Sequence, residues 1–172
     1  MTIFSSNAAP LLRITPPLLV SLALAVLDQF SKLLANARLP YGEPVAVLPS
    51  FDLLLFHNRG AAFSFLNDAS GWQRWILSAI SLSVSVFLLV WLTRLPARQR
   101  LLRWAVALIL AGALGNLYDR LFYGYVVDFI SLYWGDWRFA IFNIADAAIS
   151  IGAALLLLEM FLSRERQQEA TP

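Results

Sequence analysis

The chain has 172 residues, of which 59% are hydrophobic and only 14% charged, whereas an average soluble domain is about a quarter charged. So few charges could not cover a soluble core, and the long apolar runs are therefore interpreted as membrane spans. The net charge of +2 argues against nucleic acid as a partner. The absence of cysteine excludes a disulfide framework, a thiolate nucleophile and a Cys-ligated metal.

The first apolar run, at about 14–34, is predicted to be a membrane-spanning helix. Its early part, LLVSLALAV, has the character of a signal-peptide core, but no small-x-small cleavage site follows it and the apolar pattern continues through Phe30. We therefore expect an uncleaved helix. Asp28 and Lys32 lie four residues apart within it, and so on one face. An intrahelical ion pair, or a lysine that reaches the lipid headgroups, is the favoured interpretation of these two residues.

A segment of different composition follows at about 38–73. Its prolines and Gly42 break any helix, and its short apolar runs VAVL, FDLLLFHN and AAFSFL are predicted to be strands. An open sheet edge is not tolerated in hydrocarbon, so this small sheet is expected at the membrane surface. His57, the single histidine, is interpreted as a polar residue at the end of a strand, because a metal site needs several ligands.

Two further spans are predicted at about 75–93 and about 104–122. The connection between them, 94–103, contains no acidic residue and carries four arginines: Arg94, Arg98, Arg100 and Arg103. A short loop rich in arginine is typical of the cytoplasmic side of a membrane protein, so we expect this loop to be cytoplasmic.

An aromatic segment at about 123–141 is predicted to be a loop or short helix on the opposite, external face, and a fourth span covers about 142–162. Four spans with a cytoplasmic central loop place both termini in the cytoplasm, and the arginines near the two ends of the chain agree with this. The predicted fold is a single, mainly α membrane domain with four transmembrane helices, a small external β-sheet insert and a short external segment.

Most polar residues in and beside the spans map to the external half of this arrangement. They are Asp28 and Lys32 in the first helix, Asn58 and Arg59 in the insert, Asn116, Asp119 and Arg120 at the end of the third helix, Asp128 after it, and Asn143 and Asp146 at the start of the fourth. Ionisable residues within spans are costly and usually face the protein interior or a water-filled cavity, so each is a candidate site residue. Structural support through hydrogen bonds is the favoured interpretation of Asp119 and Arg120.

Asp128 and Asp146 lack an obvious local partner, because apolar residues flank both of them. A carboxylate at a helix N-terminus would explain Asp146, and a loop cap would explain Asp128. Catalysis is one functional alternative, and an ion pathway in a small carrier or proton-linked channel subunit is another. A non-enzymatic assembly factor with structural ion pairs is a third.

Five blocks of the sequence together resemble lipoprotein signal peptidase (signal peptidase II). They are DQFSK at 28–32, HNRGAAFSF at 57–65, GNLYDR at 115–120, VVDFI at 126–130 and FNIADAAIS at 142–150. Each block alone would be weak, but they come in the family's order across the four predicted spans and show no departure at the motif positions. Residues 1–12 and the tail after about 163 carry no motif of the family.

The resemblance implies an intramembrane aspartyl endopeptidase of the bacterial inner membrane. Such an enzyme cleaves lipid-modified prolipoproteins just before the diacylglyceryl-cysteine. It also implies Asp128 and Asp146 as the catalytic pair, and a periplasmic β-cradle in the insert. The matching positions that would support or line the site are Asp28, Lys32, Asn58, Gly60, Asn116, Arg120 and Asn143, to which the residues themselves add Asp119 as a structural support.

The expected partners are a diacylglyceryl-modified prolipoprotein and membrane lipid, and the expected state is a monomer with no metal and no cofactor. The active site is expected near the periplasmic face. Two neighbouring carboxylates share a proton, so one serves as general base on a water and the other as general acid. Which of the two is protonated at rest stays open, because a coupled pair titrates as a unit.

Overall fold

The computed structural model describes residues 10–60 and 71–169. Within these ranges it contains four long helices, α1 (Pro10–Arg38), α2 (Trp72–Arg94), α3 (Arg100–Phe122) and α4 (Ile144–Glu169). Each contains an apolar stretch of 21 to 23 residues, which is long enough to cross a bilayer. Helices α1 and α4 end at Arg38 and Glu169, beyond the predicted ends at about 34 and 162.

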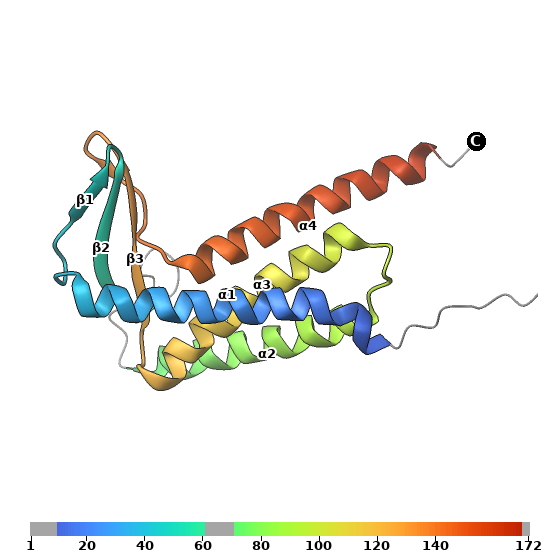
Figure 1. Cartoon of the computed structure of the whole chain (residues 1–172), viewed down its shortest axis with the longest axis horizontal. Helices are drawn as coiled ribbons and strands as arrows, with labels where there is room; N and C mark the ends of the chain where they lie inside the picture. Colours follow the sequence, from blue (N-terminus) through green and yellow to red (C-terminus); the bar gives the residue numbers. More distant parts are fainter. Residues whose placement is uncertain (1–9, 61–70, 170–172) are drawn as a thin grey trace, which may run out of the picture.

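Helix α3 is the centre of the bundle and packs against α1, α2 and α4 (Figure 1). The closest approach is to α4, where glycine is required. A Cβ atom at Gly112 would lie 2.2 Å from the carbonyl oxygen of Ala145, and one at Gly152 would lie 2.8 Å from the carbonyl oxygen of Ala105. Small residues at these crossings let the two backbones touch, as is usual between helices in membranes.

Four antiparallel strands form a sheet in the order β1 (Val45–Leu48), β2 (Phe51–Asn58), β3 (Val126–Trp134) and β4 (Trp137–Arg138). The runs VAVL and FDLLLFHN are β1 and β2, as predicted. The predicted strand AAFSFL, at 61–66, lies outside the described residues. Together the helices and the sheet confirm the predicted fold class.

The segment 123–141 corrects one detail, because it was expected to be a loop or short helix and instead supplies β3 and β4. Its β-branched and aromatic residues suit a strand. The strand β3 pairs antiparallel with the edge of β2, with Phe56 opposite Asp128 and Asn58 opposite Val126. Because this partner lies some 70 residues earlier in the chain, local composition could not reveal it.

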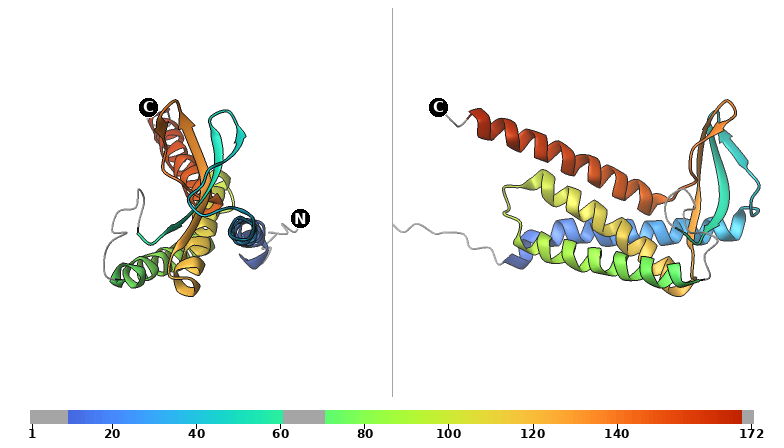
Figure 2. Two further views of the ribbon diagram at one scale, coloured as in Figure 1. Left: turned by 90° about the vertical axis from the view of Figure 1, so that its left-hand side faces the viewer. Right: turned by 180° about the vertical axis from the view of Figure 1, so that it is seen from behind.

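The sheet lies across one end of the helix bundle, and the α2–α3 connection lies at the other end (Figure 2). A buried apolar cluster joins the sheet to the end of α1. It consists of Ala35 from α1, Leu55 from β2, and Val127 and Phe129 from β3. Burial of this cluster holds β3 over the ends of the helices, with the alternate side chains of β3 turned the other way.

Candidate active site

Asp128 is placed by the pairing of β2 with β3. Its cross-strand partner is Phe56, and Asn58 lies two residues further along β2 on the same face. The Asn58 amide Nδ2 donates a hydrogen bond of 3.1 Å to Asp128 Oδ2. The Asn58 Oδ1 accepts at 3.0 Å from the backbone N–H of Gly60. The side chain of Asp128 is buried, with 2% of the residue exposed.

The segment between β4 and α4 brings Asp146 close to Asp128. Phe142 forms a β-bridge with Ile130, so the next residue, Asn143, comes to lie beside β3. Asn143 then caps α4: its Oδ1 accepts at 2.9 Å from the backbone N–H of Asp146. In return, Asp146 Oδ2 accepts at 3.3 Å from the backbone N–H of Asn143. This reciprocal capping holds the carboxylate at the positive end of the helix dipole.

Asn143 also connects the two aspartates. While its Oδ1 caps the helix, its Nδ2 donates to Asp128 Oδ1 at 2.7 Å. Asn143 therefore contacts both carboxyl groups, and it is itself fully buried. The residues that sequence reasoning singled out separately, Asp128 in VVDFI and Asp146 in FNIADAAIS, thus belong to one hydrogen-bonded unit.

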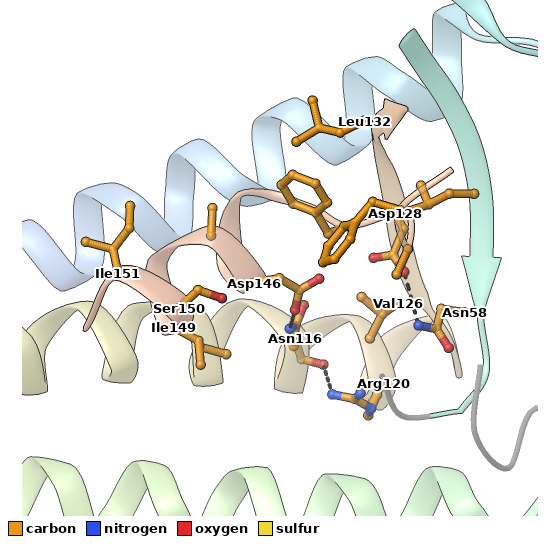
Figure 3. A pocket seen from close by; sticks show the side chains of 15 residues that line it. Asn58, Asn116, Arg120, Val126, Asp128, Leu132, Asp146, Ile149, Ser150 and Ile151 are labelled. Atoms are coloured by element: carbon orange, nitrogen blue, oxygen red, sulfur yellow. Dashed lines mark hydrogen bonds between the residues drawn. The ribbon is translucent and has the colours of Figure 1, made fainter. Parts of the chain in front are cut away.

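Helix α3 contributes two of the predicted residues on one face. Asn116 Nδ2 donates to Asp146 Oδ1 at 2.7 Å, and Arg120 Nη1 donates at 3.4 Å to the carbonyl oxygen of Asn116. Arg120 lines the same cavity as the two aspartates (Figure 3). It brings a positive charge into a cavity that also contains both carboxyl groups.

Behind the pair Asp128 and Asp146, called the dyad below, lies a buried ionic cluster. Lys32 Nζ donates to Asp28 Oδ2 at 2.8 Å, to Asp119 Oδ2 at 2.9 Å and to Asn116 Oδ1 at 3.0 Å. The lysine is 2% exposed, so it does not reach the headgroups. Burial of these charges is tolerated because all three ammonium donors have acceptors.

The two acids of this cluster also bind backbone groups of other elements. Asp28 Oδ1 accepts at 2.8 Å from the N–H of Ala145, at the start of α4. Asp119 Oδ2 accepts at 3.1 Å from the N–H of Val127, in β3. The cluster therefore fixes α1, α3, α4 and β3 relative to one another around the dyad.

Sequence reasoning missed two residues that support this arrangement. Gln29 Nε2 donates to Asp119 Oδ1 at 2.8 Å and to the carbonyl of Gly115 at 3.1 Å. Arg74 donates to the carbonyl oxygens of Arg120 and Leu121, both at 2.7 Å, at the end of α3. A glutamine inside a span was a usable signal, but an arginine at a span boundary has too many ordinary explanations.

A cavity of about 550 Å³ opens in front of the two aspartates. Its polar wall carries Asn58, Asn116 and Arg120 beside the aspartates, and its apolar wall runs along α4 past Ile149 and Ile151 (Figure 3). Burial and the nearby Asp146 raise the pKa of Asp128 to about 7, which outweighs the amide donors of Asn58 and Asn143 that act in the opposite direction. A carboxyl group with such a pKa can hold or release a proton near neutrality.

His57 lies outside this network. Its Nε2 is 2.9 Å from Asn36 Oδ1, and its ring stacks on Tyr125 with the centroids 4.1 Å apart. It therefore ties β2 to the end of α1 and to the start of β3.

Comparisons with known proteins show which family the chain resembles. The family model of signal peptidase (SPase) II matches residues 20–162. The lipoprotein signal peptidase of Pseudoalteromonas translucida is 53% identical over 142 residues, which cover 83% of this chain and 86% of the relative. That of Klebsiella pneumoniae is 50% identical over 150 residues, covering 87% and 90%.

Solved structures are similar as well. A bacterial membrane enzyme determined by the in meso method matches with a TM-score of 0.78 and 28% identity, over 88% of this chain and 91% of the other. A second such enzyme matches with a TM-score of 0.74 and 30% identity, over 85% and 92%. The chain belongs to the signal peptidase II family of aspartic peptidases.

Proposed function

We propose that this chain cleaves lipid-modified prolipoproteins just before the diacylglyceryl-cysteine, with Asp128 and Asp146 as the catalytic pair. The observation that carries the proposal is the unit formed by Asn143, which donates to Asp128 and caps the helix that carries Asp146. The family favours this function over the carrier and assembly-factor alternatives. An assay with a lipidated precursor, and with the same precursor carrying Cys→Ser and therefore no lipid, tests it: only the lipidated form is cleaved.

The chemistry follows from two carboxyl groups that hold one proton between them. The ionised carboxylate takes a proton from a water as its oxygen attacks the scissile carbonyl carbon, and the protonated partner gives its proton to the carbonyl oxygen. The tetrahedral intermediate then collapses. The first carboxyl protonates the departing amine, and the second takes back a proton from a hydroxyl, which restores the starting state.

The cavity runs along α4, which also suits the signal peptide of the proposed substrate. The apolar wall formed by Ile149 and Ile151 continues toward the membrane, where the signal peptide would lie. The dyad lies at the end of the cavity next to the sheet, where the peptide leaves the hydrocarbon. The amide groups of Asn58 and Asn116, in the polar wall, would bind backbone groups of the unwound peptide, which are costly to leave unpaired in lipid.

The dependence of activity on pH follows from the pKa of Asp128. Because only the singly protonated pair is active, kcat/KM should fall as the pH rises above about 7, where the pair loses its last proton. It should also fall at acidic pH, where both groups are protonated. Cleavage of a lipidated precursor by the purified protein, followed from pH 4 to pH 10, measures both limbs. A profile that stays flat through pH 9 would contradict a shared-proton pair.

The orientation in the membrane is also a proposal. Arg94, Arg98 and Arg100 lie at the α2–α3 end, which supports a cytoplasmic position for that end. The sheet and the cavity would then face the periplasm, the termini the cytoplasm, and the membrane would be the bacterial inner membrane. We further propose that the chain acts as a monomer.

The orientation has a direct test, because the chain has no cysteine of its own. We expect Asp136→Cys, at the exposed β3–β4 turn, to react with a membrane-impermeant thiol reagent in intact spheroplasts. Ala97→Cys, in the α2–α3 connection, should react only after permeabilisation. Labelling in the reverse order would overturn the proposed topology while leaving the dyad untouched.

A further inference from the structure

Three asparagines donate to the two aspartates, and the direction of each amide is fixed by a group other than the carboxyl that accepts from it. A side-chain amide has one accepting and one donating end, so whatever fixes the oxygen also aims the nitrogen. For Asn58 the fixing group is the N–H of Gly60, and for Asn143 it is the N–H of Asp146. In both cases Nδ2 is left to donate to Asp128.

Asn116 differs, because a charged side chain fixes its direction. Lys32 Nζ lies 3.0 Å from Asn116 Oδ1, and Asn116 Nδ2 lies 2.7 Å from Asp146 Oδ1. An ammonium group donates and cannot accept, so the amide must present its oxygen to Lys32 and its NH₂ group to Asp146. Asn143 Nδ2 also approaches Asn116 Oδ1, but at 3.4 Å and while donating to Asp128 at 2.7 Å.

Lys32 has no alternative arrangement that would free Asn116. Its other two donors bind Asp28 and Asp119, at 2.8 and 2.9 Å, and the side chain is closed off from solvent. Those acids are held in turn by the backbone N–H groups of Ala145 and Val127. The position of the ammonium is therefore set by four elements of the fold.

From these contacts we infer that Lys32 is a positioning residue that assigns the roles of the two aspartates: through Asn116 it keeps Asp146 as the ionised general base and leaves the shared proton on Asp128, the general acid. This inference rests on the proposed function. Because Lys32 fixes its direction, Asn116 can only donate to Asp146, and an oriented donor favours the ionised form of its acceptor. Asn143 donates to Asp128 at the same distance of 2.7 Å, so the choice between the two aspartates also needs the features given below. With the amide reversed, Asn116 Oδ1 would face Asp146, and only a protonated Asp146 could bond to it.

Two further features favour the same assignment. Asp146 lies in the first turn of α4, where the helix dipole stabilises an anion, and it accepts a second bond from the N–H of Asn143. Asp128 has no helix N-terminus and is more deeply buried. The raised pKa of Asp128 agrees with a proton at that site.

Several other charged groups lie near the pair, and their charges also affect the pH profile of kcat/KM. They are Asp28 and Lys32 from α1, Asp119 and Arg120 from α3, and Arg59, which directly follows the end of β2. Replacing Lys32 alone would change both the orientation of Asn116 and the net charge of this group. The test therefore has to separate the two effects.

The test compares pH profiles of kcat/KM for Lys32→Met, Lys32→Arg, Asp119→Asn and the double variant Lys32→Met/Asp119→Asn. The double variant removes one positive and one negative charge, so the net charge matches that of the parent chain. We expect its acidic limb to lie about one pH unit higher, because Asp146 has lost its oriented donor. Lys32→Arg, which still only donates, should keep the parent limb even if kcat falls.

Three results distinguish a failure of the inference about Lys32 from a failure of the proposed dyad. An acidic limb at the parent position in the double variant would overturn the role of Lys32 and indicate a purely ionic effect. The same upward shift in Asp119→Asn alone would do so as well, because that variant retains the Lys32–Asn116 contact. If Asp128→Asn and Asp146→Asn remained active, the proposed dyad itself would be wrong, whatever the Lys32 variants did.

Lys32→Met could fail to fold, because it leaves Asp28 and Asp119 buried without their cation. Asn116→Leu removes the donor to Asp146 and adds no charge beside the pair. The same upward shift of the acidic limb is expected in this variant. An unshifted limb in folded Asn116→Leu would overturn the inference without any Lys32 variant.

Discussion

Asp128→Asn and Asp146→Asn should each reduce cleavage of a lipidated precursor by about a thousandfold or more, which is the range that a general acid or base contributes. An amide can neither take the proton from the attacking water nor give one to the carbonyl oxygen. The change is nearly isosteric, so the cap of α4 and the contacts of β3 should survive. Turnover of the purified protein, with the helical circular dichroism signal as a check on folding, measures the effect.

Asp136→Asn is the matched control for these two variants. Asp136 lies in the same sheet region, at the β3–β4 turn, but it is exposed and does not line the cavity. It should retain the activity of the parent chain. Near-normal turnover in either Asp128→Asn or Asp146→Asn would show that the catalytic pair has been wrongly assigned.

Gly112→Ala should lower both the stability and the activity of the protein. The added methyl group would lie 2.2 Å from the carbonyl oxygen of Ala145 and 2.6 Å from a side-chain carbon of Ile149, so α3 and α4 must move apart. Overpacking of this kind costs about 1–3 kcal/mol. The backbone of Ala145, which donates to Asp28, adjoins Asp146, so the same displacement disturbs the dyad. The midpoint of thermal unfolding in detergent and the rate of cleavage measure the two effects.

Gly152→Ala separates stability from catalysis at the same helix contact. Its methyl group would lie 2.7 Å from Ile109 and 2.8 Å from the carbonyl oxygen of Ala105, so it should also destabilise the α3–α4 contact. It lies almost two turns further along α4 from Asp146, and its folded fraction should keep a larger part of the activity. If both variants lost activity equally at equal folded fraction, the link between Gly112 and the dyad would be wrong.

The sequence alone was sufficient for the helices and for β1 and β2, and it singled out residues that the structure brings together. Transfer of a segment into lipid depends on its own composition, so the apolar runs could be recognised locally. The predicted site residues contribute to one connected network, in which Gly60 takes part through its backbone. Helical spacing predicted that Asp28 faces Lys32, because that relation stays within one turn.

Only the tertiary structure decided how these residues act on one another. The strand β3 forms because β2 offers an edge, and Asp28 holds the start of α4 from a position 117 residues earlier in the chain. The direction of the Asn116 amide depends on an ammonium group 84 residues away. Hydrogen bonds of this kind depend on angstrom-scale positions of packed helices, which no local pattern specifies, and the proposed assignment of the general base rests on them.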